Sequence, residues 1–583
     1  MPVLVVDQVL TGADLGLDWG PSDLLYADIG GRTVLYVLSR TDGALSEATV
    51  SASGLLTPVQ SIAVSGSFVV GSDPALGLIG SSIALAGMSE NSGQFVLIDE
   101  DGSLGAQTSQ PNLGTMVAPV SFANVLISGR IDMGGLDTFV VDEVGYTWVS
   151  GLDDDATVFL ADVVGTAKIT MPDGDFIAAV SATENGVTLV EVSALGVLLA
   201  SDSFGTLDGL PIGMPSAIEA VRQLGDTYLV VAGSGSSSLS TLRVSEGGTM
   251  WMADHVLDSA DTQFQAASSL ATTTVGDFAF VAAGGADGGV SLFTMLPGGR
   301  IIHLASIMDE PATTLYRVSA LTMTAAGGAL QIFAGSAWEA GLTRLSYDLS
   351  MLGSVLVGAG PAVVGSNLND QVIGSDMADE LAGGDGDDIL FDGNGSDIMT
   401  GGPGADLFVF AADGLTDSIL DFEAGTDRLD LSAFDFLYDL SQLTITGTTN
   451  GATLTFRDET ISIHTEDGGT LGAGDFANGD ILNVDRPPLL AVHQELVGGA
   501  ENDVLNGNSG DDTISGMGGD DLISGQAGFD LLFGGDGADT LNGGTGDDSL
   551  EGNAGGDLIT GGIGDDLIDG GSGGDLIFGD DIA

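Results

Sequence analysis

The sequence predicts an all-β protein built from two kinds of repeat, with a seven-bladed β-propeller in its N-terminal part and shorter strands in its C-terminal part. Three observations support this prediction. A unit of about fifty residues recurs seven times between residues 20 and 360. A period of nine residues runs through 365–409 and 498–578. Apolar and polar residues alternate in many segments, whereas patterns with the helical period are scarce.

The fifty-residue unit is clearest at 175–204, 226–258 and 277–309, where three strands are separated by two glycine-containing turns. A further strand precedes each clear unit, and four strands per unit is the pattern of a propeller blade. Glycines of the last turn lie 43 to 54 residues apart. They are Gly54, Gly102, Gly145, Gly196, Gly248, Gly299 and Gly353. We therefore predict a propeller over 1–360, in which residues 3–9 pair with the last blade and close the ring. A pair of β-sandwiches or a β-solenoid is the alternative.

Charge also divides the chain near residue 360. The sequence has 583 residues, a net charge of −71 and no cysteine. Residues 1–360 carry 38 acidic and 9 basic residues, and residues 361–583 carry 45 acidic and 3 basic residues. This excess of acid excludes binding to a phosphate backbone through clustered Lys and Arg, so no nucleic-acid partner is expected. The lack of cysteine excludes disulfides and thiolate metal sites.

The nine-residue period divides 498–578 into nine units without a slip, and five more units fill 365–409. Position six is aspartate in all fourteen units, and position eight is Val, Leu, Ile, Met or Phe. We expect the residue at position eight to point inward, so that stacked short strands bury a thin core. A flexible Gly/Asp-rich tail does not require an apolar residue at one phase of the period. The glycines permit positive φ in tight turns, and carbonyl and carboxylate oxygens are the ligands that Ca²⁺ prefers.

This pattern resembles the RTX nonapeptide, G-G-x-G-x-D-x-U-x, of calcium-binding parallel β-rolls. The resemblance implies a first roll over 365–409 and a second over 498–578. In that family an ion lies between turns two units apart, so Asp512 would share an ion with Asp530. Asp521 would share another with Asp539. Nine units contain seven such pairs and five units contain three, which sets a ceiling of about ten Ca²⁺ ions.

The ligands that the resemblance implies are the position-six aspartates and glycines of the turns. The aspartates are Asp370, Asp379, Asp388, Asp397, Asp406, Asp503, Asp512, Asp521, Asp530, Asp539, Asp548, Asp557, Asp566 and Asp575. The glycines are Gly384, Gly386, Gly395, Gly404, Gly510, Gly519, Gly528, Gly537, Gly546, Gly555, Gly564 and Gly573. The pattern is weaker in the first two units, where position four is Leu368 and Met377.

Residues 410–485 resemble the module that follows the repeats in serralysin-type proteases and other type I secreted proteins. The residues that carry this resemblance are Asp427, Arg428, Asp430, Leu431 and Ser432. It implies a small β module that caps the first roll and separates it from the second. Residues 486–497, which contain two adjacent prolines, are the expected linker, and 579–583 form a C-terminal tail.

The sequence contains no motif of a zinc protease, a P-loop enzyme or a serine hydrolase, and it favours a protein without catalytic residues over an enzyme. The histidines are His255, His303, His464 and His493. None lies in the His-Glu-x-x-His motif of zinc proteases, and neither a P-loop nor a Gly-x-Ser-x-Gly motif occurs. His255 and His303 fall in equivalent strands of adjacent units, and they are either a functional pair or structural residues of the blades.

The N-terminus lacks a basic region and Asp7 interrupts its apolar stretch, so no cleaved secretory signal is expected. No apolar run is long enough for a membrane span. The RTX resemblance implies export by type I secretion machinery, an extracellular location and rolls that fold on external Ca²⁺. The propeller is expected to bind an unknown ligand or partner. Two alternatives stay open: a secreted propeller enzyme of the hydrolase or lactonase type, and a calcium-dependent matrix or surface-layer protein.

Overall fold

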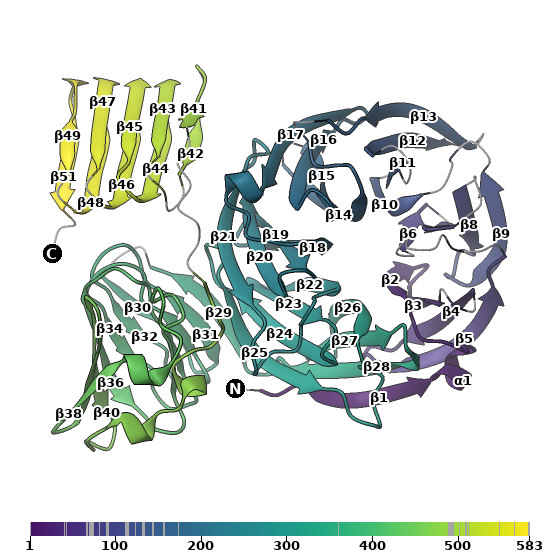
Figure 1. Cartoon of the computed structure of the whole chain (residues 1–583), viewed down its shortest axis with the longest axis horizontal. Helices are drawn as coiled ribbons and strands as arrows, with labels where there is room; N and C mark the ends of the chain where they lie inside the picture. The colour runs from purple at the N-terminus through teal and green to yellow at the C-terminus, as the bar shows by residue number, and fades with distance from the viewer. Residues whose placement is uncertain are drawn as a thin grey trace. The chain divides into compact units, whose positions relative to one another are not determined.

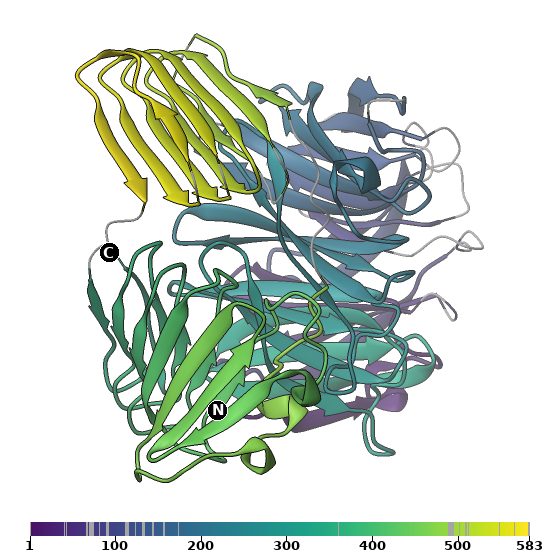
Figure 2. The same ribbon diagram turned by 60° about the vertical axis from the view of Figure 1, so that its left-hand side comes forward.

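The structure is a computed structural model of the whole chain (Figure 1, Figure 2). It describes every residue except 1, 40, 42, 66, 67, 69–74, 81, 89–92, 111, 112, 114, 115, 123, 131–133, 143, 144, 156, 157, 173, 359, 360, 488–494, 501, 508, 509, 511, 547, 565 and 581–583. The described chain divides into two compact units, one of residues 1–352 and 484–486 and one of residues 353–483 and 487–583.

Both units consist almost entirely of strands, as the sequence predicts. Among the described residues, the one α-helix is the four-residue α1 (Gly12–Leu15). Short 3-10 helices lie at η1 (Thr206–Asp208), η2 (Leu440–Gln442), η3 (Ala473–Asp475) and η4 (Asn478–Asp480). Within the described part of the chain, no helix has the length and hydrophobicity needed to cross a membrane.

Seven four-stranded antiparallel sheets form the propeller of the first unit, and Figure 1 shows them arranged in a ring. Blade one consists of β2 (Asp23–Ile29), β3 (Arg32–Ser39), β4 (Ala44–Val50) and β5 (Leu56–Ala63). Blade two consists of β6 (Leu76–Ile79), β7 (Ser82–Leu85), β8 (Gly93–Ile98) and β9 (Leu104–Gln110). Blade three consists of β10 (Val117–Phe122), β11 (Val125–Gly129), β12 (Leu136–Asp142) and β13 (Gly145–Leu152).

The next three blades have the same order of strands. Blade four consists of β14 (Val163–Met171), β15 (Gly174–Ser181), β16 (Gly186–Val192) and β17 (Leu198–Gly205). Blade five consists of β18 (Pro215–Gln223), β19 (Asp226–Gly233), β20 (Ser238–Val244) and β21 (Met250–Leu257). Blade six consists of β22 (Ser269–Val275), β23 (Phe278–Gly284), β24 (Gly289–Met295) and β25 (Ile301–Met308).

The seventh blade takes its fourth strand from the other end of the propeller. It consists of β26 (Val318–Ala326), β27 (Ala329–Ser336), β28 (Glu339–Asp348) and β1 (Val5–Thr11). β1 pairs antiparallel with β28, for example Leu10 with Leu342, so the predicted closing strand is confirmed. This pairing covers the edge that β28 would otherwise expose. Because β1 fills the fourth place, Gly353 is not a blade turn, as the sequence suggested, but part of β29 (Leu352–Val357) in the second unit.

The recurrent turn glycines have a packing role between blades. Gly102 and Gly299 have φ of +84° and +96°, a region that residues with a side chain rarely adopt. Their carbonyls are bound by buried side chains of the preceding blade: Tyr36 Oη donates to Gly102 O over 2.5 Å, and Thr241 Oγ1 to Gly299 O over 2.7 Å. The period seen in the sequence is therefore the spacing of contacts that join one blade to the next.

The first roll is a coil in which each turn contains two nonapeptide units. One sheet contains β29, β31 (Asn369–Ile373), β33 (Ile389–Phe391), β35 (Leu407–Val409) and β37 (Arg428–Asp430). The other contains β30 (Ala362–Val364), β32 (Glu380–Ala382), β34 (Ile398–Thr400), β36 (Thr416–Phe422), β40 (Glu459–Thr465), β39 (Gly451–Phe456) and β38 (Thr444–Thr448). Neighbouring strands of the repeat are parallel with partners eighteen residues apart, such as Ile389 and Leu407. All five position-eight side chains are fully buried between the two sheets.

Residues 410–485 continue the first roll. β36 pairs in parallel with both β34 and β40, and β40, β39 and β38 then form an antiparallel extension of the same sheet. Side chains such as Phe422, Leu454 and Ile463 belong to the same hydrophobic cluster as Met399 and Phe408. The segment thus shares its core with the repeats and covers the apolar end of the coil.

The second roll repeats this coil without an extension, and Figure 2 shows its strands side by side. One sheet contains β41 (Glu495–Val497), β43 (Thr513–Gly518), β45 (Leu531–Asp536), β47 (Ser549–Gly555) and β49 (Leu567–Asp569), with β50 (Ser572–Gly573) beside β47. The other contains β42 (Val504–Asn506), β44 (Leu522–Ala527), β46 (Thr540–Thr545), β48 (Leu558–Ile563) and β51 (Leu576–Asp580). Its core is one layer of position-eight residues: Ile514, Ile523, Leu532, Leu541, Leu550 and Ile559.

The expected linker is shorter than 486–497 at both ends. Glu495–Val497 form β41, and Arg486 belongs to the propeller unit. Arg486 binds both carboxylate oxygens of Asp254, at 2.7 and 3.0 Å, and Leu257 N–H donates to Asp485 O over 2.8 Å. The short segment 484–486 is therefore an integral part of the propeller.

Candidate metal centres

The position-six aspartates of the rolls form ladders of hydrogen bonds. From the third unit of each roll onward, Oδ1 accepts from the backbone N–H of the aspartate eighteen residues earlier: Asp530 from Asp512 over 2.7 Å, and Asp539 from Asp521 over 2.8 Å. The structure thus brings together both pairs that the sequence singles out. Eleven of the fourteen side chains are buried; Asp503, Asp566 and Asp575, near the ends of the second roll, are partly exposed.

The second carboxylate oxygen of many of these residues is buried without a hydrogen-bond donor. In the described part of the chain this holds for Oδ2 of Asp388, Asp397, Asp406, Asp521, Asp539 and Asp557. A buried ionised oxygen without a partner is costly, and a cation is the partner that a row of such oxygens requires.

For Asp388, Asp521, Asp539 and Asp557, a backbone carbonyl lies beside this oxygen, above the glycine at position one. A Cβ on Gly516 would lie 2.2 Å from Asp521 Oδ2 and 2.6 Å from Gly534 O. Two hard oxygen donors, one charged and one neutral, therefore converge on one small volume, which suits Ca²⁺. Position one was not among the predicted site residues. Its signal in the sequence is that thirteen of the fourteen units have glycine there.

The predicted glycines allow the turns to stack. Gly537 has φ of +149°, and a Cβ there would lie 1.7 Å from Gly519 O of the preceding turn. A positive φ is also found at Gly384, Gly386, Gly395, Gly404, Gly519, Gly528, Gly546, Gly564 and Gly573. Gly555 differs in φ, but its Cβ would lie 1.3 Å from Gly537 O, and Gly510 lies in the corresponding turn. These residues shape the site through their backbone.

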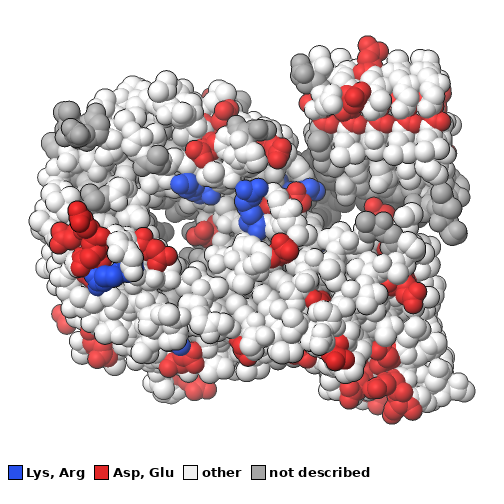
Figure 3. Space-filling view, turned by 180° about the vertical axis from the view of Figure 1, so that it is seen from behind, with Lys and Arg blue, Asp and Glu red and all other residues white. Residues whose placement is uncertain are grey.

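Burial raises the pKa of several position-six carboxylates above the usual value. It raises the pKa of Asp388 and Asp397 to about 7 and that of Asp406 to about 8, and neighbouring aspartates add to the effect. The ionised roll is therefore electrostatically strained. Figure 3 shows acidic side chains in a straight row across the second roll. A divalent cation bound to these oxygens would remove the strain.

The first two units of the first roll fit a metal less well. Asp370 Oδ1 accepts from Ser354 N–H over 2.5 Å, and its Oδ2 accepts from both the N–H and the Oγ–H of Ser366. Ser375 binds Asp379 Oδ2 in the same way. Ser366 and Ser375 stand at position two of their units. Their N–H and Oγ–H groups donate to the Oδ2 atoms of Asp370 and Asp379, whereas Oδ2 in later units such as that of Asp388 has no donor.

Acidic residues beyond the repeats continue both ladders. Asp397 N–H donates to Asp417 Oδ1 over 2.9 Å, and Asp406 N–H donates to Asp427 Oδ1 over 3.0 Å. These partners lie twenty and twenty-one residues further along the chain, so the nine-residue period does not reveal them. Asp427 was noted only for its resemblance to a family module, and Asp417 was missed.

The propeller has a separate cavity on its axis. The innermost strands of all seven blades line it, and its volume is about 400 Å³. Asp23 on β2 and Glu219 on β18 face it, and burial raises the pKa of each to about 7. Ala, Ser, Thr and apolar side chains form most of the remaining wall, and its described lining contains neither a basic residue nor a histidine.

None of the described histidines lines the axial cavity. His255 on β21 is buried, its Nδ1 lies 2.8 Å from Ser240 Oγ, and burial lowers its pKa to about 4. His303 on β25 lies 2.8 Å from Ser306 Oγ and packs against Phe293. Both lie on the fourth strands of their blades, whereas the first strands line the axial cavity. His464 lies on β40, and His493 lies outside the described residues.

Comparison with protein families identifies the repeats. The RTX calcium-binding nonapeptide repeat matches four times, at residues 373–408, 495–523, 515–550 and 551–581. The chain therefore carries RTX calcium-binding repeats in both rolls. No curated protein matches the chain.

Several solved structures resemble about half of the chain. A protein from Lactobacillus plantarum is 15% identical, with 50% of this chain and 88% of that chain covered and a TM-score of 0.37. A protein of unknown function from Desulfotomaculum acetoxidans is 13% identical, with 51% and 91% covered and a TM-score of 0.37. A putative 6-phosphogluconolactonase from Bacteroides fragilis is 15% identical, with 52% and 86% covered and a TM-score of 0.40. Likenesses this distant carry no conclusion about function.

Proposed function

We propose that this chain is an exported calcium-binding protein whose rolls fold when extracellular Ca²⁺ fills their turns, and whose propeller binds a ligand. The observation that carries the proposal is the buried position-six oxygen, such as Asp521 Oδ2, that has a carbonyl beside it and no hydrogen-bond donor. This arrangement recurs in both rolls at the spacing of the RTX repeat.

Folding and calcium binding are coupled in this proposal. Residues 361–583 have 45 acidic and 3 basic residues, and eleven of the fourteen position-six aspartates are buried in the folded rolls. Without a cation, repulsion and desolvation oppose the coil, whose core is only one layer thick. Each bound Ca²⁺ supplies free energy to the folded state alone, so its binding free energy becomes folding free energy.

Export follows from the same coupling. Calcium is scarce in a bacterial cytosol, so the rolls stay unfolded there and the chain can be threaded through type I secretion machinery. Outside, calcium sites of the extracellular class, with Kd of about 10⁻⁴–10⁻³ M, fill and fold the rolls. RTX repeats are typical of secreted proteins, which supports this location.

A calcium titration followed by far-UV circular dichroism tests the coupling. Addition of CaCl₂ to the EGTA-treated chain is expected to produce a cooperative gain of β signal. The double variant D521N/D539N should need more calcium, because two ligand charges are lost from one ladder. The control D536N removes an exposed charge at position three of the same roll and should leave the midpoint nearly unchanged. A β signal that is complete without calcium would contradict the proposal.

The ligand of the propeller is best matched by a small cation. Two carboxylates, from Asp23 and Glu219, face a cavity of about 400 Å³ without a basic residue in its described lining. Burial raises their pKa to about 7 because it destabilises the ionised carboxylates, and a bound cation would stabilise these ionised forms. Calorimetric titration with putrescine, an organic dication, is expected to show binding that Glu219→Gln abolishes. Equal binding by both proteins would place the cation elsewhere.

A matrix or surface-layer role is the competing proposal. It requires self-association through calcium, and light scattering with and without Ca²⁺ distinguishes it. A monomeric chain at saturating calcium would exclude the matrix role, and growth of large particles would favour it.

A further inference from the structure

One nonapeptide unit departs from the others at position one. Residue 392 is aspartate, whereas the other thirteen units have glycine there. In the preceding unit, a Cβ on Gly383 would lie 2.3 Å from Asp388 Oδ2 and 2.7 Å from Gly401 O. A side chain at position one is therefore placed where the oxygens of a turn converge. At residue 392 that side chain is itself a carboxylate.

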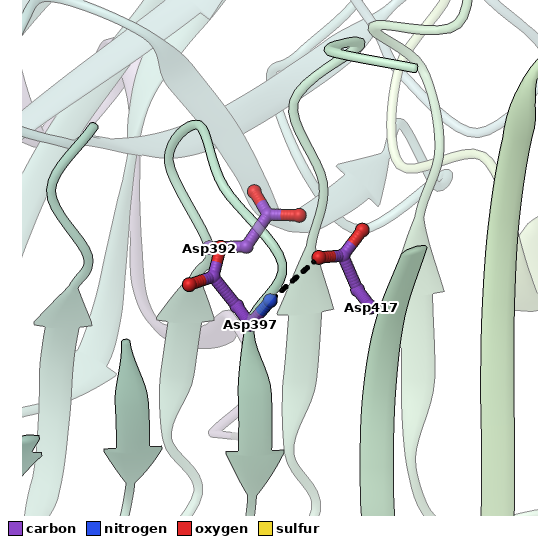
Figure 4. Close-up of side chains that lie close together, drawn as sticks. All are labelled: Asp392, Asp397 and Asp417. Carbon is purple, nitrogen blue, oxygen red and sulfur yellow. Dashed lines mark hydrogen bonds between the residues drawn. The ribbon is translucent and has the colours of Figure 1, made fainter. Parts of the chain in front are cut away.

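Three carboxylates meet at this turn (Figure 4). Asp392, Asp397 and Asp417 each offer one oxygen, and these three oxygens lie within 4.8 Å of one another. The residues come from three places in the coil: the end of β33, the start of β34 and the strand β36. Their exposed fractions are 2%, 1% and 4%. Asp397 Oδ2, in this nearly inaccessible cluster, has no hydrogen-bond donor.

The backbone around the cluster holds the side chains in place. Asp392 Oδ1 accepts from Ala411 N–H over 2.8 Å, and Asp417 Oδ1 accepts from Asp397 N–H over 2.9 Å. The charged groups that act on Asp392 are all acids, namely Asp397, Asp413 and Asp417. Since like charges this close repel, the cluster needs a positive partner, and no described side chain around Asp392 supplies one.

We propose that Asp392, Asp397 and Asp417 form a three-carboxylate Ca²⁺ site that binds more tightly than the other turns of the rolls. The inference rests on the proposed calcium-dependent folding and adds an order to it. Calcium affinity in proteins rises with the number of charged ligands and with the rigidity of the site. This site has both, because its ligands are buried and β36 belongs to the sheet that continues into β40. Its ion is the first to bind, next to the extension that covers the end of the first roll.

Equilibrium dialysis of the full chain against EGTA-buffered calcium tests the order of binding, with bound calcium measured by atomic absorption. In the unaltered protein, one ion should bind at a free Ca²⁺ concentration at least about tenfold below the remainder. Asp392→Asn keeps an oxygen that can accept from Ala411 N–H and removes the charge. Asp392→Gly restores the residue found in the other units. Both variants should shift the first ion into the range of the remaining ions.

Asp385→Asn is the matched control, because it removes an exposed carboxylate from the adjacent unit of the same roll. It should retain the early ion. If Asp392→Asn retains the early ion, or if the control loses it equally, Asp392 is not a ligand and the inference is overturned. If calcium binds to all proteins in a single phase, the inference fails while the proposed function stands. If the unaltered chain binds no calcium at millimolar concentration, the proposed function itself fails.

Discussion

Replacement of Leu541 by alanine in the second roll tests how folding and calcium binding are linked. Leu541 is a position-eight residue of β46 with 1% of its surface exposed, and its strand neighbours at the same level are Ile523 and Ile559. The core is a single layer of position-eight side chains between two sheets, so alanine leaves a cavity that the neighbouring side chains of this layer fill poorly. A loss of about 3 kcal/mol in the free energy of unfolding is expected.

The size of the calcium shift follows from the number of ions that bind on folding. Nine units provide at most seven pairs of turns, and a tenfold change in concentration corresponds to about 1.4 kcal/mol per ion. If seven ions bind together, a loss of about 3 kcal/mol raises the calcium midpoint about twofold. If folding depends on a single ion, the same loss raises the midpoint more than a hundredfold.

The assay is the far-UV circular dichroism titration with CaCl₂ from the EGTA-treated state. Leu558→Ala is the control, because Leu558 occupies position seven of β48 with 39% of its surface exposed. It should change stability by about 0.5 kcal/mol or less, which is too little to move a multi-ion midpoint measurably. An unchanged midpoint for Leu541→Ala, or an equal shift for both variants, would refute the coupling of core packing to calcium binding.

Three further predictions concern other parts of the chain. Arg486→Ala should destabilise the propeller by about 3 kcal/mol in thermal unfolding, because Asp254 stays buried without this partner. Arg243→Ala, which breaks the more exposed pair with Asp226, should cost less than about 1 kcal/mol. Equal losses would contradict this prediction. Met517→Gly should raise the stability of the second roll by up to about 1 kcal/mol, because Met517 has φ of +74° at a position where eight of the fourteen units have glycine. A lower midpoint in urea would count against it. Burial raises the pKa of Glu219 to about 7, so the folded propeller binds more protons than the unfolded chain between about pH 4.5 and 7. The stability of the propeller should therefore fall as pH rises through this window, and Glu219→Gln should reduce the slope. Identical pH profiles of the two proteins would show that Glu219 does not titrate in this way.

The periodic parts of the fold were predictable from the sequence because their contacts repeat at a fixed spacing. Partners eighteen residues apart in the rolls follow from two nine-residue units per turn, and this places Asp512 beside Asp530. The blade strands follow from the alternation of apolar and polar residues and from turn glycines such as Gly299. Gly299 has a positive φ, and its carbonyl accepts a hydrogen bond from Thr241 of the preceding blade. Even the closing strand was predictable, since a ring of seven sheets needs a cover for its last edge.

The remaining features depend on contacts that no local period records. The period breaks after the first roll, so only the coil itself brings Asp417 against Asp397 and Asp392. The return of Arg486 to Asp254 spans 232 residues, and the meeting of Asp23 and Glu219 at one cavity depends on the closure of the ring. The sequence by itself determined the two repeats, their strands and the aspartates of the turns, because each is a local and repeated requirement. Only the tertiary structure decided which carboxylates share a buried space, because burial and mutual repulsion arise when distant segments pack together.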